Sequence, residues 1–359
     1  MTPKRIAVLG AGGFLGSHLV PGLIARFGCE IDAVDIDLRK LEYEDSRIQR
    51  IEASVEDPAL VAEVTRRADV VLSLTALCNP AQYSTIPLQV IAANFTDLMP
   101  LVSACAEKRL RLIHFSTAEV YGRRALDRSG APTTAMSEDE SCLLMGPVHL
   151  ERWTYACAKQ LLERVIWAHG QHGELPFTLI RPFNTIGPRM DFVPGIDGDG
   201  TPRVLACFLA ALMRGEPLQL VNGGSQRRAF MSANDMVEAV SRVVARPQAC
   251  RGQILNLGNP DNELSIAELA RRLASAFSAL NPQSPAARFE SVSADAFYGV
   301  GYDDTEERIP DIRKAGRLLD WQPREALSSM LPGIVEDYMR RYGTQVAAER
   351  SAITIREAS

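Results

Sequence analysis

The fold is decided near the N-terminus by the stretch "RIAVLGAGGFLGSHLVPGLIARFG", residues 5–28. It begins with a short apolar run typical of a buried strand, passes through a glycine-rich turn, and continues with the apolar spacing of an amphipathic helix. The segment "EIDAVDID", residues 30–37, then has the pattern of a second strand. Together these segments predict a β-α-β unit, in which two parallel strands are joined by the helix.

The glycine-rich turn supplies five candidate cofactor-binding residues: Gly10, Gly13, Phe14, Leu15 and Gly16. Glycines in such a turn let the backbone approach a pyrophosphate, whose charge then faces the N-terminus of the helix. Asp35 ends the second strand, where its carboxylate could accept the ribose hydroxyls of adenosine and repel a 2′-phosphate. We therefore predict NAD, rather than NADP, as the cofactor. The alternative is an ordinary structural turn with a solvated Asp35.

Three later segments also have the pattern of buried strands: "ADVVLSLTAL" (68–77), "RLIHFST" (111–117) and "FTLIRPF" (177–183). They alternate with helical patterns at 98–110 and 154–170. Strands and helices that alternate along a chain are typical of a parallel sheet covered by helices on both faces. The predicted fold class is therefore α/β, with a doubly wound parallel sheet of the Rossmann type.

The pattern changes after about residue 184. A loop rich in Gly, Pro and Asp (187–203) is followed by a helix, by short strands at 218–224 and 253–259, and by a final helical stretch. We predict an NAD-binding domain over residues 1–184 and a smaller substrate-binding lobe over 185–345, with some segments that return to the first domain. Residues 346–359 are predicted to be a flexible tail.

Composition restricts the partners. The chain has 359 residues, 46% of them hydrophobic and 23% charged, and its net charge of -5 is spread without a basic block, so we expect no nucleic-acid partner. We find no apolar run of roughly 20 residues and expect no membrane span. The N-terminus enters a strand pattern directly, which favours a cytoplasmic protein. The 7 cysteines have no metal-ligand spacing, so we predict no metal site.

Tyr155 and Lys159 lie four residues apart in the helical pattern 154–170, and therefore on one helix face. A lysine cation nearby can favour the tyrosinate, which could act as a general base near neutral pH. Thr117, at the end of the strand 111–117, offers a hydroxyl that would hold a substrate alcohol beside the tyrosine. The Tyr–Lys spacing alone occurs by chance in many helices, so the alternative is the solvent edge of an amphipathic helix.

Combined with the glycine-rich turn, these residues resemble the short-chain dehydrogenase/reductase superfamily, in its extended, nucleotide-sugar branch. Five segments narrow the resemblance: "RLIHFSTAEVYG" (111–122), "RWTYACAKQLLERVIWA" (152–168), "RPFNTIGPRMDFVPGIDG" (181–198), "PRVLACF" (202–208) and "GYDDTEERIPDIRKAGRLLDWQP" (301–323). They are similar to the UDP-glucuronate decarboxylases, and most of all to the group of UDP-apiose/UDP-xylose synthases. The likeness covers residues 4 to 340, nearly the whole chain.

The resemblance implies an enzyme that keeps NAD and uses it catalytically. C4 of UDP-glucuronate would be oxidised, carbon dioxide would leave, and the hydride would return to give UDP-apiose, UDP-xylose or both. Tyr155, assisted by Lys159, would take the proton of the 4-hydroxyl, and Thr117 would bond the same oxygen. Tyr155 and Lys159 would also contact the cofactor. Glu119 matches an acidic residue that positions the sugar and handles protons. Arg308 matches an arginine near the substrate carboxylate; without the resemblance it would be assigned to the surface.

Three positions bear on the product. Cys78 matches one of two cysteines that lie near the sugar in the apiose-forming enzymes. Ala118 stands where those enzymes have the other cysteine and plain decarboxylases have serine, and Thr185 stands where the relatives have tryptophan. These departures leave oxidation at C4 intact. They leave the product open among UDP-apiose, UDP-xylose, a UDP-4-keto-pentose and a C4 epimer.

The resemblance also assigns the nucleotide end of a UDP-sugar. Asn184, Arg203 and Arg228 match residues that hold the diphosphate and uridine, and Tyr302 matches one that contacts the nucleoside. Arginine suits phosphate because its planar fork makes paired, charge-assisted hydrogen bonds. Asp304 could fix the arginine four residues later or contact the sugar, with the capping of a loop as an equal alternative.

Two further expectations concern assembly and function class. The helix that carries Tyr155 and Lys159 has a second apolar side, "LLERVIWA", and relatives pair such helices, so we expect a homodimer. A hexuronate 4-epimerase is an alternative within the same enzyme type. The alternative from another class is an NAD-binding sensor or scaffold protein, which the Thr117, Tyr155 and Lys159 set disfavours.

Overall fold

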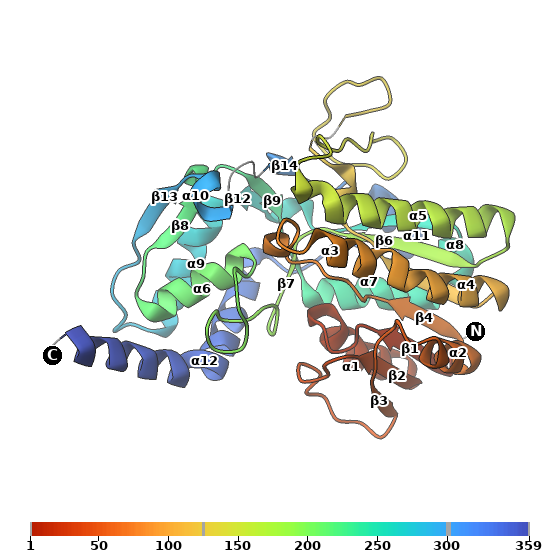
Figure 1. The fold of residues 1–359 in the computed structure, drawn as a ribbon, viewed down its shortest axis with the longest axis horizontal. Helices are drawn as coiled ribbons and strands as arrows, with labels where there is room; N and C mark the ends of the chain where they lie inside the picture. Colours follow the sequence, from red (N-terminus) through yellow and green to blue (C-terminus); the bar gives the residue numbers. More distant parts are fainter. Residues whose placement is uncertain (1, 124–125, 299–302, 358–359) are drawn as a thin grey trace.

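The computed structural model describes residues 2–123, 126–298 and 303–357. A larger N-terminal lobe and a smaller lobe lie side by side, with β7 and α6 near their junction (Figure 1). The larger lobe is built on a 7-stranded sheet with the order β11-β6-β5-β4-β1-β2-β3. All of its neighbouring strands are parallel. The predicted doubly wound parallel α/β fold is thereby confirmed.

The strands of this sheet are β1 (Arg5–Leu9), β2 (Glu30–Asp35), β3 (Ile48–Glu52), β4 (Val70–Ser73), β5 (Arg111–Phe115), β6 (Phe177–Pro182) and β11 (Gln253–Leu257). The helices packed on it are α1 (Phe14–Phe27), α2 (Pro58–Arg67), α4 (Met99–Glu107), α5 (Thr154–His172), α7 (Ala233–Ala245) and α11 (Arg313–Leu319). Shorter helices in this lobe are α3 (Pro87–Asn94), α8 (Pro247–Cys250), η1 (Pro80–Gln82), η2 (Thr96–Leu98), η3 (Ala118–Tyr121) and η4 (Glu151–Trp153).

The helices divide between the two faces of the sheet because side chains alternate along each strand. In β1, Ile6 and Val8 join one buried cluster, which is completed by α1, α7 and α11. Ala7 and Leu9 join the opposite cluster, with α2, α4 and α5. Both faces of the sheet are buried, so its strands are almost continuously apolar, as the sequence pattern indicates.

The smaller lobe packs α6 (Val204–Arg214), α9 (Ile266–Leu280) and α12 (Leu327–Glu357) around one apolar cluster. Its other elements are β7 (Thr185–Ile186), β8 (Leu218–Val221), β9 (Arg227–Ala229), β10 (Met231–Ser232), β12 (Glu263–Ser265), β13 (Phe289–Val292), β14 (Glu307–Arg308), α10 (Ala294–Tyr298), η5 (Asn222–Gly224) and η6 (Pro260–Asn262). Phe14, from the glycine-rich turn, is part of the same cluster. The turn that is predicted to hold the cofactor therefore also joins the two lobes.

The assignment of residues 253–259 to the smaller lobe is wrong. Residues Gln253–Leu257 form β11, which pairs with β6 at the edge of the large sheet, and α7 packs against α1. We expected some segments after residue 184 to return to the first domain. The apolar run at 253–259 is too short to indicate that it is one of them. The sequence pattern also missed β3. Its residues are half-buried or exposed because it lies at the other edge of the sheet, so it has no apolar run.

Two other segments differ from expectation. Helix α12 runs through residue 346 to Glu357, so the segment predicted as a flexible tail begins inside a helix, where Val346 is buried and Glu349 pairs with Arg214. The stretch Pro87–Glu107 is long and apolar enough to cross a membrane by length and composition alone, although the sequence pattern indicated no such run, and the absence of a membrane span stays a prediction. In the structure it is divided into α3, η2 and α4, and α4 packs on the sheet through Leu101.

Candidate active site

A cavity of about 1190 Å³ opens between the lobes, at the carboxyl ends of β1, β4, β5 and β6. Its lining includes most of the predicted site residues: Gly10, Gly13, Phe14, Leu15, Gly16, Cys78, Thr117, Glu119, Tyr155, Lys159, Asn184, Arg203, Arg228, Asp304 and Arg308. Asp35 lies one strand away, at the end of β2. Tyr302, predicted to contact the nucleoside, lies outside the described residues.

The glycine-rich turn fits a bound pyrophosphate. Gly10 has a φ of 89°, and a Cβ atom at Gly16 would lie 2.2 Å from the carbonyl oxygen of Gly10, so neither position suits a larger residue. Helix α1 starts after Gly13 without a side-chain cap. Because Gly13 and Leu15 line the cavity, the positive end of the helix faces it.

Asp35 is held rigidly beside the same turn. One carboxylate oxygen accepts from the backbone N–H of Gly12 at 2.9 Å, and the other accepts from the N–H of Ile36 at 2.8 Å. Burial raises the pKa of Asp35, while these backbone donors act in the opposite direction. The carboxylate is therefore oriented at the strand end where the ribose of a dinucleotide lies in sheets of this kind.

Tyr155 and Lys159 lie on the buried face of α5. The Lys159 ammonium donates to the carbonyl oxygen of Phe115, the last residue of β5, at 3.0 Å, which ties the helix to the strand that precedes Thr117. Burial lowers the pKa of Lys159 to about 8, although interactions with the nearby Cys78 and Glu163 act to raise it.

The structure gives a pKa of Tyr155 well above its usual value, because burial disfavours the phenolate. Cys78 and Glu119 act in the same direction. A hydrogen bond with Thr117 and the charge of Arg203 act in the opposite direction without offsetting the burial. The expected assistance of Tyr155 by Lys159 stays a prediction.

Glu119 is the centre of a largely buried ionic group, in which its own side chain is 12% exposed. Its carboxylate accepts from both terminal nitrogens of Arg152, at 2.6 and 3.1 Å, and lies 3.5 Å from Arg308. Burial alone would raise the pKa of Glu119, but the charges of Arg152 and Arg308 outweigh it and hold the pKa below its usual value. Glu119 is therefore a carboxylate at neutral pH.

Asp304 extends this group toward the smaller lobe. It accepts from Arg228 at 2.8 Å and lies 3.5 Å from Arg152. Burial would raise the pKa of Asp304, but Arg228, Arg152 and Arg308 together hold it below its usual value. Arg228 and Arg308 are opposite each other in the parallel pair β9 and β14. The alternative that Asp304 fixes Arg308 is supported only by a long separation of 3.9 Å.

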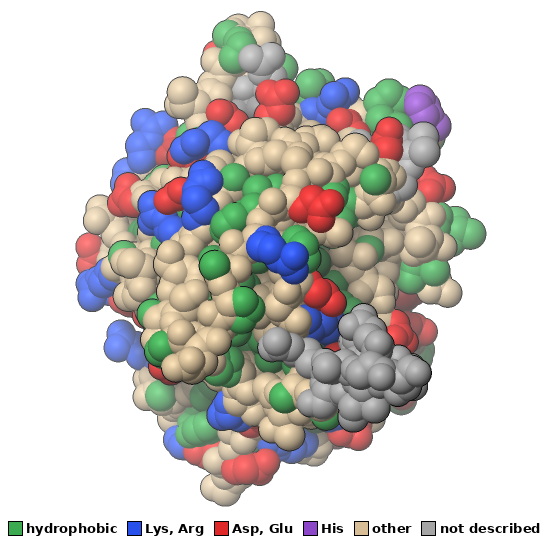
Figure 2. All heavy atoms as spheres, turned by 90° about the vertical axis from the view of Figure 1, so that its left-hand side faces the viewer, with side chains coloured by type: hydrophobic (Ala, Val, Ile, Leu, Met, Phe, Trp, Pro, Cys, Tyr) green, Lys and Arg blue, Asp and Glu red, His purple; other side chains and the backbone are tan. Residues whose placement is uncertain are grey.

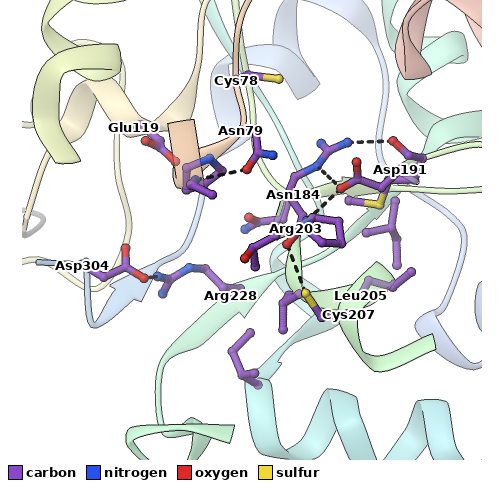
Figure 3. A pocket seen from close by; sticks show the side chains of 18 of the residues that line it. Cys78, Asn79, Glu119, Asn184, Asp191, Arg203, Leu205, Cys207, Arg228 and Asp304 are labelled. Atoms are coloured by element: carbon purple, nitrogen blue, oxygen red, sulfur yellow. Dashed lines mark hydrogen bonds and ion pairs between the residues drawn. The ribbon is translucent and has the colours of Figure 1, made fainter. Parts of the chain in front are cut away.

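Arg203 stands on the other side of the pocket, where it pairs with Asp191, and Asn184 lies between this pair and the Asp304–Arg228 pair (Figure 3). The Arg203 Nε donates to Asp191 at 3.1 Å, and its guanidinium lies 6.0 Å from the ring centre of Phe14. The arginine is therefore held between the two lobes, beside the cofactor turn.

The residues that bear on the product share this cavity. Cys78 follows β4 and is exposed, whereas Ala118 is buried beside Phe183. Thr185, the second departure from the relatives, also lines the cavity and donates its hydroxyl to the Phe183 carbonyl at 3.2 Å. The structure therefore brings all three positions to one site.

Sequence reasoning missed two residues that the structure places in the site. Arg152 precedes Tyr155 by three residues, a spacing that could have indicated a shared face. Tyr83 follows η1, in a loop whose pattern gave no signal, and both side chains are buried.

Charge elsewhere on the protein is mixed. On the face drawn in Figure 2, Lys and Arg side chains are interspersed with Asp and Glu. Among residues 2–123, 126–298 and 303–357, no cluster of three or more His, Cys, Asp or Glu is arranged to hold a metal ion. The expectation that nucleic acid is not a partner stays a prediction.

The chain is similar to several known proteins. The model of the NAD dependent epimerase/dehydratase family matches residues 6–258. A UDP-D-apiose/UDP-D-xylose synthase from Oryza sativa subsp. japonica is 41% identical over 92% of this chain and 88% of its own length. UDP-D-apiose/UDP-D-xylose synthase 1 from Arabidopsis thaliana is 39% identical over 96% of this chain and 93% of its own. The crystal structure of PbgP3 from Burkholderia pseudomallei has a TM-score of 0.83 and 32% identity, covering 96% of this chain and 98% of that one.

The orientation of Asp35 predicts that NAD binds at least about tenfold more tightly than NADP, because a 2′-phosphate would meet a carboxylate in a partly buried place. Dissociation constants of both dinucleotides, measured by calorimetry on cofactor-free protein, test this. Asp35→Asn should reduce the preference. Asp37→Asn is the matched control, since that carboxylate pairs with Arg39 at the surface. Equal affinity of the wild-type protein for NADP would contradict the prediction.

Proposed function

The chain belongs to the NAD dependent epimerase/dehydratase family, and we propose that it catalyses the oxidative decarboxylation of UDP-glucuronate to UDP-xylose, UDP-apiose or both. The observation that carries this proposal is the buried ionic group beside Tyr155. Three arginines (Arg152, Arg228 and Arg308) face two carboxylates (Glu119 and Asp304), which leaves one positive charge in excess. A sugar that brings its own carboxylate would neutralise this charge. The plant synthases described above support the choice of a UDP-hexuronate.

The cavity has room for both a dinucleotide and a UDP-sugar. We assign the cofactor to the turn at Gly10–Gly16 and to Asp35. Arg203 and Asn184 would hold the diphosphate of the substrate, and the guanidinium of Arg203 is already oriented by Asp191. This arrangement would direct the sugar toward Tyr155 and the ionic group.

The reaction would begin with removal of the 4-hydroxyl proton by Tyr155, with the same oxygen held by Thr117. NAD, when bound, supplies the hydride acceptor for C4 and a positive nicotinamide charge that favours the Tyr155 phenolate. The resulting 4-ketone makes the sugar a β-keto acid, so loss of carbon dioxide leaves an enolate at C4 and C5. Hydrogen bonds from Thr117 and Tyr155 would stabilise that oxyanion.

The ionic group would control the carboxylate end of the sugar. Arg308 is largely buried but lines the cavity, so its guanidinium is placed to meet the carboxylate of a bound sugar. Glu119 is ionised at neutral pH, and is therefore suited to accept a proton or hold a sugar hydroxyl rather than to donate. Its bidentate pair with Arg152 fixes the direction in which it does so.

The direct test is to incubate the purified protein with UDP-glucuronate and NAD, then follow carbon dioxide release and sugar products by NMR. We expect carbon dioxide and a UDP-pentose, with no net reduction of NAD. A hexuronate product without carbon dioxide would replace the proposal with 4-epimerisation. If the protein shows no turnover and no reduction of bound NAD, the result would favour an NAD-binding sensor.

We also propose that the protein is a homodimer formed through α3 and α5. These helices contact each other and lie side by side in Figure 1. Leu88 and Ile91 on α3 are 80% and 38% exposed, and Leu161 on α5 is 48% exposed. Large apolar side chains gathered on two neighbouring helices fit a self-complementary interface around a two-fold axis.

Substitutions should separate oxidation from handling of the carboxylate. Tyr155→Phe should lower the rate of oxidation about a hundredfold or more, because general-base catalysis is lost. Arg308→Ala should slow carbon dioxide release while NAD stays bound, measured by single-turnover kinetics with UDP-glucuronate. Arg227→Ala is a control, because this neighbouring arginine pairs with Glu263 near the surface. Full activity of Arg308→Ala would contradict the proposed role.

Ala118 provides a test of product choice. If a missing thiol limits ring contraction, Ala118→Cys should shift the products toward UDP-apiose, and the size-matched Ala118→Ser should shift them toward UDP-xylose. Product ratios by NMR give the result. A wild-type protein that already makes mostly UDP-apiose, with the same ratio in both variants, would show that this side chain does not select the route.

Introduced charge should break the proposed dimer. Leu88→Asp combined with Leu161→Asp should convert the dimer to a monomer at about micromolar concentration, since each buried carboxylate would lose its hydration. Sedimentation velocity measures the change. Leu280→Asp is the control, because this residue is also exposed but lies on α9 in the other lobe. A monomeric wild-type protein would overturn the proposal.

A further inference from the structure

Tyr83 forms a buried platform under the proposed base. It follows η1, after the cavity-lining segment that contains Cys78, and only 1% of it is exposed. Its ring is stacked on that of Tyr155, with a centroid separation of 5.0 Å and an interplanar angle of 13°. The two rings are therefore nearly parallel and in contact, and Tyr83 restricts one face of Tyr155.

Arg152 links this platform to the ionic group. Its guanidinium carbon lies 5.4 Å from the ring centre of Tyr83, within range of a cation–π interaction. The same guanidinium is held by the bidentate pair with Glu119. The order of contacts is thus Glu119, Arg152, Tyr83 and Tyr155. One connected group spans the carboxylate proposed to handle the sugar and the phenol proposed to take its 4-hydroxyl proton.

Tyr83 is also fixed from the side of α3. Val90, on that helix, is fully buried in the same small cluster as Tyr83 and Tyr155, with Leu77 and Ile86 packed against it. A ring enclosed in this way has little freedom to tilt, because protein interiors are closely packed. The position of Tyr83 is therefore set by packing as well as by Arg152.

We propose that Tyr83 is a positioning residue: its ring, held by Arg152 and α3, keeps the Tyr155 phenol at the angle needed to reach the 4-hydroxyl of the sugar. This inference rests on the proposed function, in which Tyr155 exchanges that proton. A displacement of the base by about 1 Å is enough to cost a large part of the rate. The role depends on the ring of Tyr83 and not on its hydroxyl.

The stack also bears on the titration of Tyr155. Burial is the main influence that raises the pKa of this phenol, and Tyr83 covers one of its faces. The ionisable groups around Tyr155 are Cys78, Tyr83, Glu119, Lys159 and Arg203. Removal of the Tyr83 ring would admit water on one side and leave the other groups in place. The pKa of Tyr155 should then fall toward its usual value.

The test compares Tyr83→Leu with Tyr83→Phe by single-turnover reduction of bound NAD with UDP-glucuronate. Tyr83→Leu should lower the maximal rate about tenfold, the worth of a stacked aromatic pair, with a much smaller change in KM. It should also move the acid limb of the pH–rate profile to lower pH. Tyr83→Phe should recover most of the rate and the original limb, because it keeps the ring.

Two results would overturn the positioning role. If Tyr83→Phe is as slow as Tyr83→Leu, the rate depends on the hydroxyl of Tyr83, and loss of the ring stack does not explain the slower reaction. If Tyr83→Leu raises KM and leaves the maximal rate and the pH limb unchanged, the residue binds substrate and does not position the base.

A separate measurement keeps this inference distinct from the proposed function. If wild type neither reduces NAD nor releases carbon dioxide with UDP-glucuronate, the proposed function fails. The stack is then tested by the ultraviolet absorbance of the Tyr155 phenolate, isolated by subtracting the spectrum of a matched Tyr155→Phe protein. The titration midpoint should be lower in the Tyr83→Leu protein, which lacks the ring, than in the Tyr83→Phe protein, which keeps it. Equal midpoints in the two variants would overturn the effect of the stack on Tyr155.

Discussion

Parallel pairing of β4, β1, β5 and β6 is the constraint on which the site depends. Because the carboxyl ends of parallel strands meet at one edge of the sheet, residues far apart in sequence are brought to the same place. The glycine-rich turn follows β1, Cys78 follows β4, Thr117 follows β5 and Asn184 follows β6. The hydrogen bond from Lys159 to the β5 backbone then places α5 over this edge, and with it Tyr155. The sheet and α5 thus position the residues proposed to carry out the oxidation, without help from the smaller lobe.

The smaller lobe adds charge, and the charges are stable only as a set. Removing a carboxylate or a guanidinium from water is costly unless it is paired and hydrogen-bonded. Glu119, which is largely buried, lies between Arg152 and Arg308, and Asp304, which is partly exposed, lies between Arg152 and Arg228. Each carboxylate keeps a lowered pKa in spite of burial because its arginines outweigh the loss of hydration. A buried group with one positive charge in excess is suited to an anionic sugar and poorly suited to a neutral one.

Features set by neighbouring residues could be predicted from the sequence, whereas contacts between distant segments could not. The glycine-rich turn and the spacing of Tyr155 and Lys159 are local patterns, and the structure brings both to one cavity. Strand β11 could not be assigned because a five-residue apolar run looks the same in either lobe, and only its pairing with β6 decides. The contact between Tyr83 and Tyr155 joins residues that are far apart in the sequence and has no local signature. For Arg228 and Arg308, the resemblance supplied what spacing could not, since their proximity comes from the pairing of β9 with β14.

Helix α3 connects the proposed homodimer with the proposed role of Tyr83. It has one residue, Val90, buried against the Tyr83–Tyr155 stack, and neighbouring residues, Leu88 and Ile91, exposed on its outer side. A helix of 8 residues is too short to be stable alone, so its position depends on what packs against it. Burial of the outer side by a second subunit would restrict α3, and through Val90 it would restrict the ring on which the base rests. The association of the two subunits and the alignment of Tyr155 would then depend on the same short helix.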